Sequence, residues 1–176
     1  MTMPPRLRKA VLAAHVVTSV GWLGAVMAYI ALDVTAVASS DANRVRAAYL
    51  AMDMIAGAAI IPLALASVVI GVVHGLGTPW GLFRHYWVLA KLLLTLIATA
   101  VLLVQSRTIT SLARAADGSS DPGALSGTLP HSIGGLLVLL IALVLSVYKP
   151  KGVTRYGWSK QQELQGHRRT ATAAGP

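Results

Sequence analysis

The chain of 176 residues contains no cysteine and few charged residues, and both absences narrow what the protein can be. Without cysteine, neither a disulfide framework nor a thiolate metal site can form, and covalent haem attachment through C-x-x-C-H is excluded. Charged residues make up 12% of the chain, whereas soluble domains usually hold about 25%. Together with 55% hydrophobic residues and a mean hydropathy of +0.66, this composition predicts a single integral membrane module.

The sequence also lacks the motifs of common hydrolases and nucleotide-binding proteins. There is no phosphate-binding G-x-x-x-x-G-K-[ST] loop, no H-E-x-x-H pair and no G-x-S-x-G elbow. Acidic residues are scarce, six against fifteen Lys and Arg, which gives a net charge of +9. The basic residues flank apolar runs, so we interpret them as a topology signal and not as a nucleic-acid-binding surface.

Four apolar runs are each close to the roughly 20 residues that a helix needs to cross a bilayer. They cover about 10–37, 51–76, 85–104 and 129–148. Because the hydrocarbon core offers the backbone no hydrogen bonds, these runs are expected to be helices. The sequence therefore predicts an all-α integral membrane four-helix bundle over 1–148, followed by a basic tail, 149–176, that we expect to be disordered.

The stretch "AVASSDA" at the end of the first run also resembles a signal-peptide cleavage site. The run is longer than a typical signal core, however, and this length favours a retained span.

The two tails and the connection after the second run hold ten Lys and Arg, and the other two connections hold four. By the positive-inside rule, both termini are expected in the cytoplasm. The connection 114–130 is rich in turn formers and is expected to be a flexible outer loop.

Polar, aromatic and small residues recur at helical spacing within the runs, so each run has one face that differs in composition from the rest of the helix. The opposite faces consist of Leu, Val, Ile and Ala, which suit lipid, and the distinct faces are therefore expected to converge inside the bundle. We interpret their small residues as packing positions. The faces of the first two runs are His15, Ser19, Trp22, Val26, Tyr29 and Asp33, and Asp53, Gly57, Ile60, Ala64, Ser67, Gly71 and His74. Those of the last two are Arg84, Trp87, Lys91, Thr95, Ala98 and Gln105, and His131, Gly135, Val138, Ala142 and Lys149.

Ionisable residues inside a membrane are candidates for function, and several are expected at the same cytoplasmic depth. Imidazoles on facing helices can bind a haem iron axially, bind copper or zinc, or pass protons, while aromatic residues pack against a macrocycle. We therefore hypothesise b-type haem or a related tetrapyrrole, bound through His15 with His74 or His85. The alternative for Lys91 is that it extends to the interface. The expected cofactor-binding residues are His15, His74, His85, Lys91, Trp22 and Trp87.

Other interpretations remain open. At the outer end, Asp33, Asp53 and His131 form a weak candidate cation site, whose alternative is a set of membrane-end charges in water. The lack of a complete catalytic motif favours a non-catalytic membrane partner or assembly subunit, in a homodimer or with another membrane protein, over an enzyme. A small metal or proton transporter is a further alternative.

The stretch "AAHVVTSVGWLGAVMAY" resembles the first span of bacterial CopD-like membrane proteins and HemJ-type protoporphyrinogen oxidases, in which a histidine precedes W-x-G or W-L-G. "IIPLALASVVIGVVHGLG" and "HYWVLAKLLLTL" are similar to their second-span proline and glycine and to the tryptophan and lysine that open their third span. As a whole, the chain resembles more closely an uncharacterised family of small, mainly actinobacterial, integral membrane proteins.

These resemblances imply a place in the bacterial cell membrane. The HemJ likeness implies that His15 is a haem ligand or catalytic-site residue of a membrane oxidoreductase, and that Lys91 is that family's intramembrane lysine. The CopD likeness implies copper transfer.

Overall fold

The computed structural model describes residues 3–77, 82–125, 127–150, 152–155, 157–159 and 162. Helices α1 (Pro5–Ala38), α4 (Tyr86–Gly118) and α5 (Leu129–Tyr148) each form one rod, and the fourth rod combines α2 (Ala42–Ile55), the π-helix η1 (Ala56–Ile60) and α3 (Ile61–Leu76). All four rods are long and apolar enough to cross a membrane. Within the described residues the only strand-like pairing is an isolated bridge between His85 and Val153. The predicted all-α, four-helix membrane architecture is confirmed.

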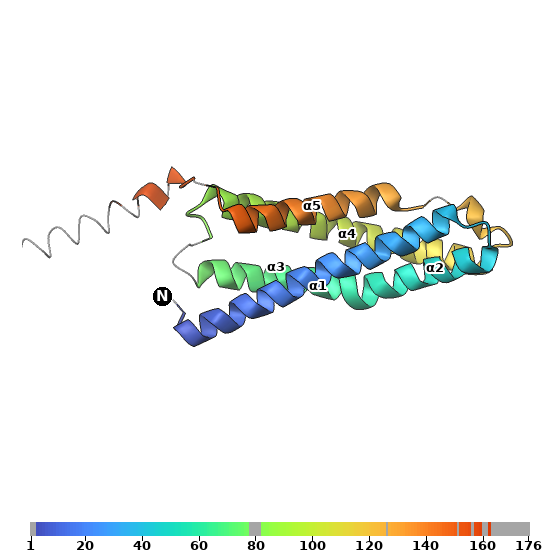
Figure 1. Cartoon of the computed structure of the whole chain (residues 1–176), viewed down its shortest axis with the longest axis horizontal. Helices are drawn as coiled ribbons and strands as arrows, with labels where there is room; N and C mark the ends of the chain where they lie inside the picture. The colour runs from blue at the N-terminus through green and yellow to red at the C-terminus, as the bar shows by residue number, and fades with distance from the viewer. Residues whose placement is uncertain are drawn as a thin grey trace, which may run out of the picture.

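The rods run alternately up and down the bundle. Helix α1 packs against α2, α3 and α5, and α4 packs against the same three helices. The start of α1, the α3–α4 connection and the end of α5 lie together at one end, which we call the proximal end (Figure 1). The α1–α2 and α4–α5 connections lie at the other end, which we call the distal end.

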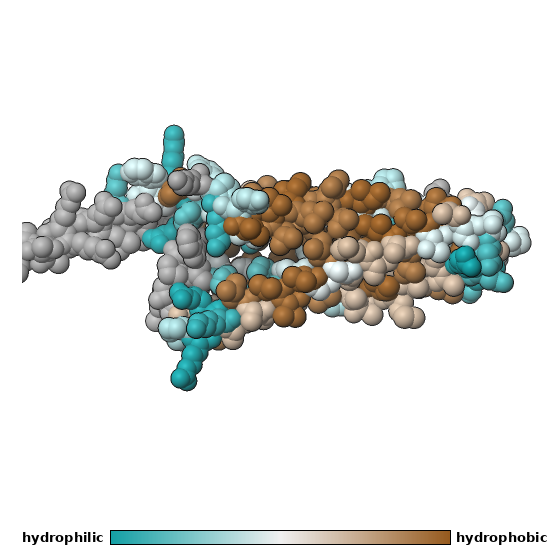
Figure 2. Space-filling model, in the orientation of Figure 1, coloured by the Kyte–Doolittle hydropathy of each residue, from teal (hydrophilic) through white to brown (hydrophobic). Residues whose placement is uncertain are grey.

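The lateral surface of the bundle is apolar. On the face seen in Figure 2, hydrophobic residues cover most of the middle of the bundle, and hydrophilic residues gather at its two ends. Large aliphatic side chains such as Val69, Val104 and Val147 are exposed on the lateral surface. Such a surface suits lipid and not water, because apolar patches of this extent are rare on soluble proteins.

The face predicted for the first span is the buried face of α1. Trp22, Val26, Tyr29 and Asp33 are buried and are followed by Ala36. They pack in the distal half of the bundle against a core from the neighbouring helices. That core includes Val45, Ala48, Tyr49, Met52, Ile60, Ile109 and Leu139. The helical spacing of these residues in the sequence therefore correctly predicted which side of α1 faces inward.

The second span differs from the prediction at η1, just before Pro62. Proline lacks the N–H that would bond to the carbonyl four residues earlier, and a π-helical turn is one way in which a helix absorbs this disruption. The wider turn changes which side chains face inward. Ala56 is buried and Gly57 is exposed, whereas the regular spacing predicted Gly57 on the inward face. From Ile60 onward the predicted face is buried again at Ala64 and Ser67.

The distal end is more helical than expected. Helix α4 continues to Gly118, so the expected flexible loop from Arg114 is wrong for its first residues. The Arg46 guanidinium of α2 donates to the carbonyl oxygens of Ala116 at 3.1 Å and Ser119 at 2.9 Å. These bonds satisfy carbonyl groups that a helix end leaves without partners. A short 3-10 helix, η2 (Pro122–Ala124), then leads toward α5.

The first residues after α5 pair with the α3–α4 connection. The Thr154 amide donates to the Arg84 carbonyl at 2.9 Å, and the Thr154 hydroxyl donates to the Phe83 carbonyl. The Tyr86 amide donates to the Gly152 carbonyl at 3.4 Å. The start of the expected disordered tail is therefore held at the proximal end, and most of 149–176 lies outside the described residues.

Candidate functional site

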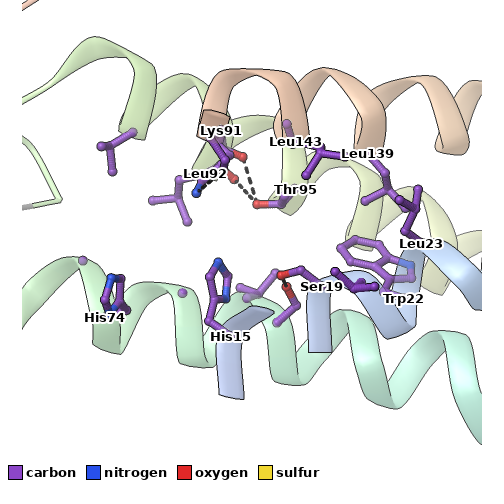
Figure 3. A pocket seen from close by; sticks show the side chains of 18 of the residues that line it. His15, Ser19, Trp22, Leu23, His74, Lys91, Leu92, Thr95, Leu139 and Leu143 are labelled. Atoms are coloured by element: carbon purple, nitrogen blue, oxygen red, sulfur yellow. Dashed lines mark hydrogen bonds between the residues drawn. The ribbon is translucent and has the colours of Figure 1, made fainter. Parts of the chain in front are cut away.

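A cavity of about 180 Å³, which we call the inner cavity, lies between the helices in the proximal half of the bundle. Helix α1 contributes His15 and Ser19, and α3 contributes Ser67 and His74. Figure 3 shows His15, Ser19 and His74 facing Lys91 and Thr95 of α4 across the space, with Trp22 and Leu139 toward the distal side. The polar lining residues are His15, Ser19, Ser67, His74, Lys91, Thr95 and Ser146.

Two histidines from different helices form one wall of the inner cavity. The ring centroids of His15 and His74 are 6.5 Å apart, and the rings are inclined by 14°. The Nδ1 atom of each ring is buried and has no hydrogen-bond partner among the described residues. Buried polar atoms normally have partners, so two unsatisfied ring nitrogens side by side are an unusual feature of this wall.

Glycine at position 71 makes this arrangement possible. A Cβ atom at Gly71 would lie only 2.9 Å from Cε1 of His15. The absence of a side chain lets the His15 ring lie directly against α3. The small-residue face of the second span therefore does more than bring helices together, because it makes room for a polar group.

Lys91 forms the opposite wall. Its Nζ donates to Ser146 Oγ at 2.9 Å and lies 5.7 Å from the centroid of a Trp87 ring. No carboxylate is among the described residues that line the cavity. The acidic residues Asp33, Asp41, Asp53, Asp117 and Asp121 all belong to the distal half, and Glu163 lies outside the described residues. The cavity therefore combines a cation with neutral polar groups and has no negative charge of its own.

The hydroxyl groups around the cavity have different roles. Ser19 and Ser67 hydrogen-bond to each other at 2.8 Å across the α1–α3 interface. Thr95 donates back to the carbonyl oxygens of Lys91 and Leu92, both at 3.0 Å. Ser146 accepts from Lys91 and so holds the ammonium group toward the cavity.

A second cavity of about 360 Å³, which we call the outer cavity, lies toward the distal end. Its lining is mostly aliphatic and aromatic and includes Val26, Ile60, Val101, Leu102, Ile109 and Val138. Trp22 and Leu139 line both cavities, so the cavities lie next to each other at these two residues. The two cavities therefore adjoin, and Lys91 and the two histidines belong to the inner one.

A polar cluster closes the distal side of the outer cavity. Asp33 is 0% exposed and accepts hydrogen bonds from the Thr128 amide at 3.2 Å and the Thr128 hydroxyl at 2.7 Å. It also accepts from Ser132 Oγ at 3.1 Å. Because the Thr128 proton goes to Asp33, the Tyr29 hydroxyl is the donor in its 2.8 Å bond to Thr128. This cluster ties α1 to the start of α5.

Five of the expected cofactor-binding residues meet at the inner cavity, and one does not. His15, Trp22, His74, Trp87 and Lys91 all line it. His85 instead occupies the N-cap position of α4, with its ring 6.3 Å from that of Trp87.

The sequence prediction missed Ser146, the partner of Lys91. Its signal is a lone serine in an aliphatic run, four residues after Ala142 on the face already assigned to the fourth span. The same helical spacing, applied between Ala142 and Lys149, includes it.

The structure does not bring the outer cation set together. Asp33 is engaged by Thr128 and Ser132, Asp53 accepts from Thr110 at 2.7 Å, and His131 lines the outer cavity. The described part of the chain contains no group of three His, Cys, Asp or Glu side chains arranged to hold a metal ion. Hydrogen bonds between helices explain Asp33 and Asp53.

Comparisons of the chain with protein-family models, curated proteins and solved structures find no match.

Proposed function

We propose that this multi-pass membrane protein binds a small anionic group, a carboxylate or a phosphate, in the inner cavity. The observation that carries the proposal is Lys91, whose ammonium group is held toward the cavity by Ser146, while the described lining residues include no carboxylate. The side chains of His15 and His74 lie on the opposite wall of the same cavity (Figure 3).

The energetics of charge in a membrane favour this function. An ionised side chain within the bilayer is costly unless it is paired, and intramembrane ionisable residues usually mark functional sites. Attraction between opposite charges is also much stronger at low dielectric constant than in water. A bound carboxylate or phosphate would compensate Lys91 and accept charge-assisted hydrogen bonds, which are the stronger kind.

Calorimetric titration of the purified protein with acetate and with inorganic phosphate tests this proposal. Lys91→Met removes the ammonium group and is expected to abolish binding, whereas Lys9→Met removes an equal charge from an exposed position on α1 and is expected to leave it unchanged. Equal losses in both variants, or no binding of either anion by the wild type, would contradict an anion site at Lys91.

We also propose b-type haem or a related tetrapyrrole as a second candidate ligand, because two imidazoles from different helices, His15 and His74, line the same cavity. His15 and His74, whose ring centroids are 6.5 Å apart, are the residues that would hold the iron, which would supply redox chemistry at this position. The carboxylates of such a ligand also suit Lys91.

A visible spectrum of the purified protein, recorded with and without added haemin, tests the second candidate. A Soret band that is lost in His15→Ala would support it. The absence of a band, or a band unchanged in His15→Ala, would eliminate haem and leave the anion site standing.

For the orientation, we propose that the proximal end faces the cytoplasm of the cell. Arg6, Arg8, Lys9, Arg84 and Arg155 belong to this end, and the described part of it contains no acidic residue. An excess of Lys and Arg marks the cytoplasmic side of membrane proteins. The inner cavity would then lie in the cytoplasmic half of the bilayer.

A further inference from the structure

The outer cavity is twice the size of the inner one and lies directly beyond it. It measures about 360 Å³ against about 180 Å³, and Trp22 and Leu139 belong to the walls of both. Along α1, the distance from His15 at the inner cavity to Tyr29 at the outer cavity is about 20 Å at 1.5 Å per residue. This distance is comparable to the length of a long hydrocarbon chain.

The two cavities differ in chemistry in a way that matches the two ends of an amphiphile. The inner cavity presents Lys91, His15 and His74, which suit an anionic head. The outer cavity presents mainly aliphatic side chains, such as Val26, Leu102 and Val138, which suit a chain that forms no hydrogen bonds. A single molecule with an anionic head and a hydrocarbon chain would place its head in the inner cavity and its chain in the outer cavity.

The outer cavity is also accessible from the side of the bundle. Ile97 and Val101 of α4 line it and are 52% and 47% exposed on the apolar surface. In a bilayer this surface faces acyl chains. A lipid-dissolved chain could therefore reach the outer cavity without passing through water.

We infer that the ligand of the inner cavity is a single-chain anionic amphiphile, whose head lies between Lys91 and the His15–His74 pair. Its hydrocarbon chain passes Trp22 and Leu139 into the outer cavity. This inference rests on the proposed anion site and adds the class of molecule that the site takes.

Two glycines allow the outer cavity to be filled selectively. An added Cβ would meet no atom within 4 Å at Gly134 or Gly135, and both residues line the outer cavity. Leucine at either position would fill part of the outer cavity, where the hydrocarbon chain is inferred to lie, and would leave Lys91 unchanged. Gly24 is equally open but is exposed on α1 and lines neither cavity, so Gly24→Leu is the matched control.

The experiment measures the binding of acetate, dodecanoate, inorganic phosphate and dodecyl phosphate to the full chain in nanodiscs of phosphatidylcholine, a zwitterionic lipid with no net charge. We expect Gly135→Leu, and independently Gly134→Leu, to weaken binding of both dodecyl ligands by about tenfold. Acetate and phosphate binding should stay unchanged in these variants, and Gly24→Leu should change neither class. Thermal unfolding of each variant identifies any that fails to fold, and the second glycine variant then serves in its place. A preference between the two dodecyl ligands distinguishes a carboxylate head from a phosphate head.

The outcomes separate this inference from the proposed function. If acetate and phosphate bind through Lys91 but neither glycine variant affects the dodecyl ligands, the chain does not occupy the outer cavity and the inference is overturned. If the glycine variants weaken dodecanoate binding but Lys91→Met does not, the head lies elsewhere and the inference is also overturned. If none of the four ligands binds, the proposed anion site itself is wrong.

Discussion

His15 of α1 and His74 of α3 place their rings 6.5 Å apart at an inclination of 14°, each with a buried Nδ1 atom that has no hydrogen-bond partner among the described residues. A pair of histidines that served only to join two helices would be expected to satisfy those nitrogens. Lys91 lies across the cavity from them (Figure 3). The three side chains leave a polar space that a ligand can complete.

Replacing Gly71 with alanine should disturb this pair directly. The new Cβ would lie 2.9 Å from Cε1 of His15, which is the far end of a side chain that can rotate away. We expect anion affinity to fall about fivefold, while the free energy of unfolding changes by less than about 1 kcal/mol. Calorimetry and thermal unfolding in detergent measure the two effects. Gly24→Ala, at an open position, should change neither, and unchanged affinity in Gly71→Ala would argue against a binding role for His15.

Replacing Asp33 with asparagine should destabilise the distal end. Asp33 is buried and accepts three hydrogen bonds from Thr128 and Ser132, and an amide can accept on only one of its two terminal atoms. We expect a loss of about 1–3 kcal/mol in the free energy of unfolding, measured by denaturation in detergent. The exposed Asp117→Asn variant is the control and should be nearly neutral. Equal stability of the two variants would refute a structural role for the Asp33 cluster.

Replacing Arg46 with alanine should loosen the end of α4. The guanidinium bonds to Ala116 and Ser119 would be lost, which leaves carbonyl groups of the helix end without partners. We expect amide hydrogen exchange over 113–118 to accelerate about tenfold while the membrane-spanning part of α4 is unaffected. Arg44→Ala, at an exposed neighbouring position, should leave exchange unchanged. Exchange as slow in Arg46→Ala as in the wild type would show that the helix end is stable without this cap.

The absence of cysteine makes the proposed orientation easy to measure. A single cysteine can be introduced at Ser40 in the distal connection or at Ser159 near the proximal end, both exposed. On intact cells, a membrane-impermeant maleimide should label Ser40→Cys and not Ser159→Cys, and permeabilisation should expose the second. Labelling of Ser159→Cys on intact cells would reverse the orientation.

Much of the fold was predictable because a membrane simplifies the physical problem. Apolar length identified four spans, and the spacing of His15, Trp22, Tyr29 and Asp33 identified the inward face of α1. Within the candidate site, spacing also placed Lys91 correctly on the inward side of α4. These features depend on residues close in sequence, where helical geometry fixes which side chains share a face.

Other features depend on contacts between distant segments and were not predictable in this way. The π-helix before Pro62 changes which residue of the second span is buried, although proline alone does not dictate how a helix adapts. The Arg46 cap and the pairing of Thr154 with Arg84 each join segments far apart in the chain. The meeting of the two cavities at Trp22 and Leu139 likewise requires the packing of two helices.

The most direct test of the anion site follows the histidine rings themselves. We would record ¹⁵N NMR spectra of side-chain-labelled histidine in the purified protein during titration with acetate and with phosphate, assigning signals with single His→Asn variants. We predict that the ring nitrogens of His15 and His74 shift with the added anion, that His131 does not, and that Lys91→Met abolishes the shifts. Unchanged His15 and His74 signals at saturating anion, or identical shifts in Lys91→Met, would contradict binding in the inner cavity.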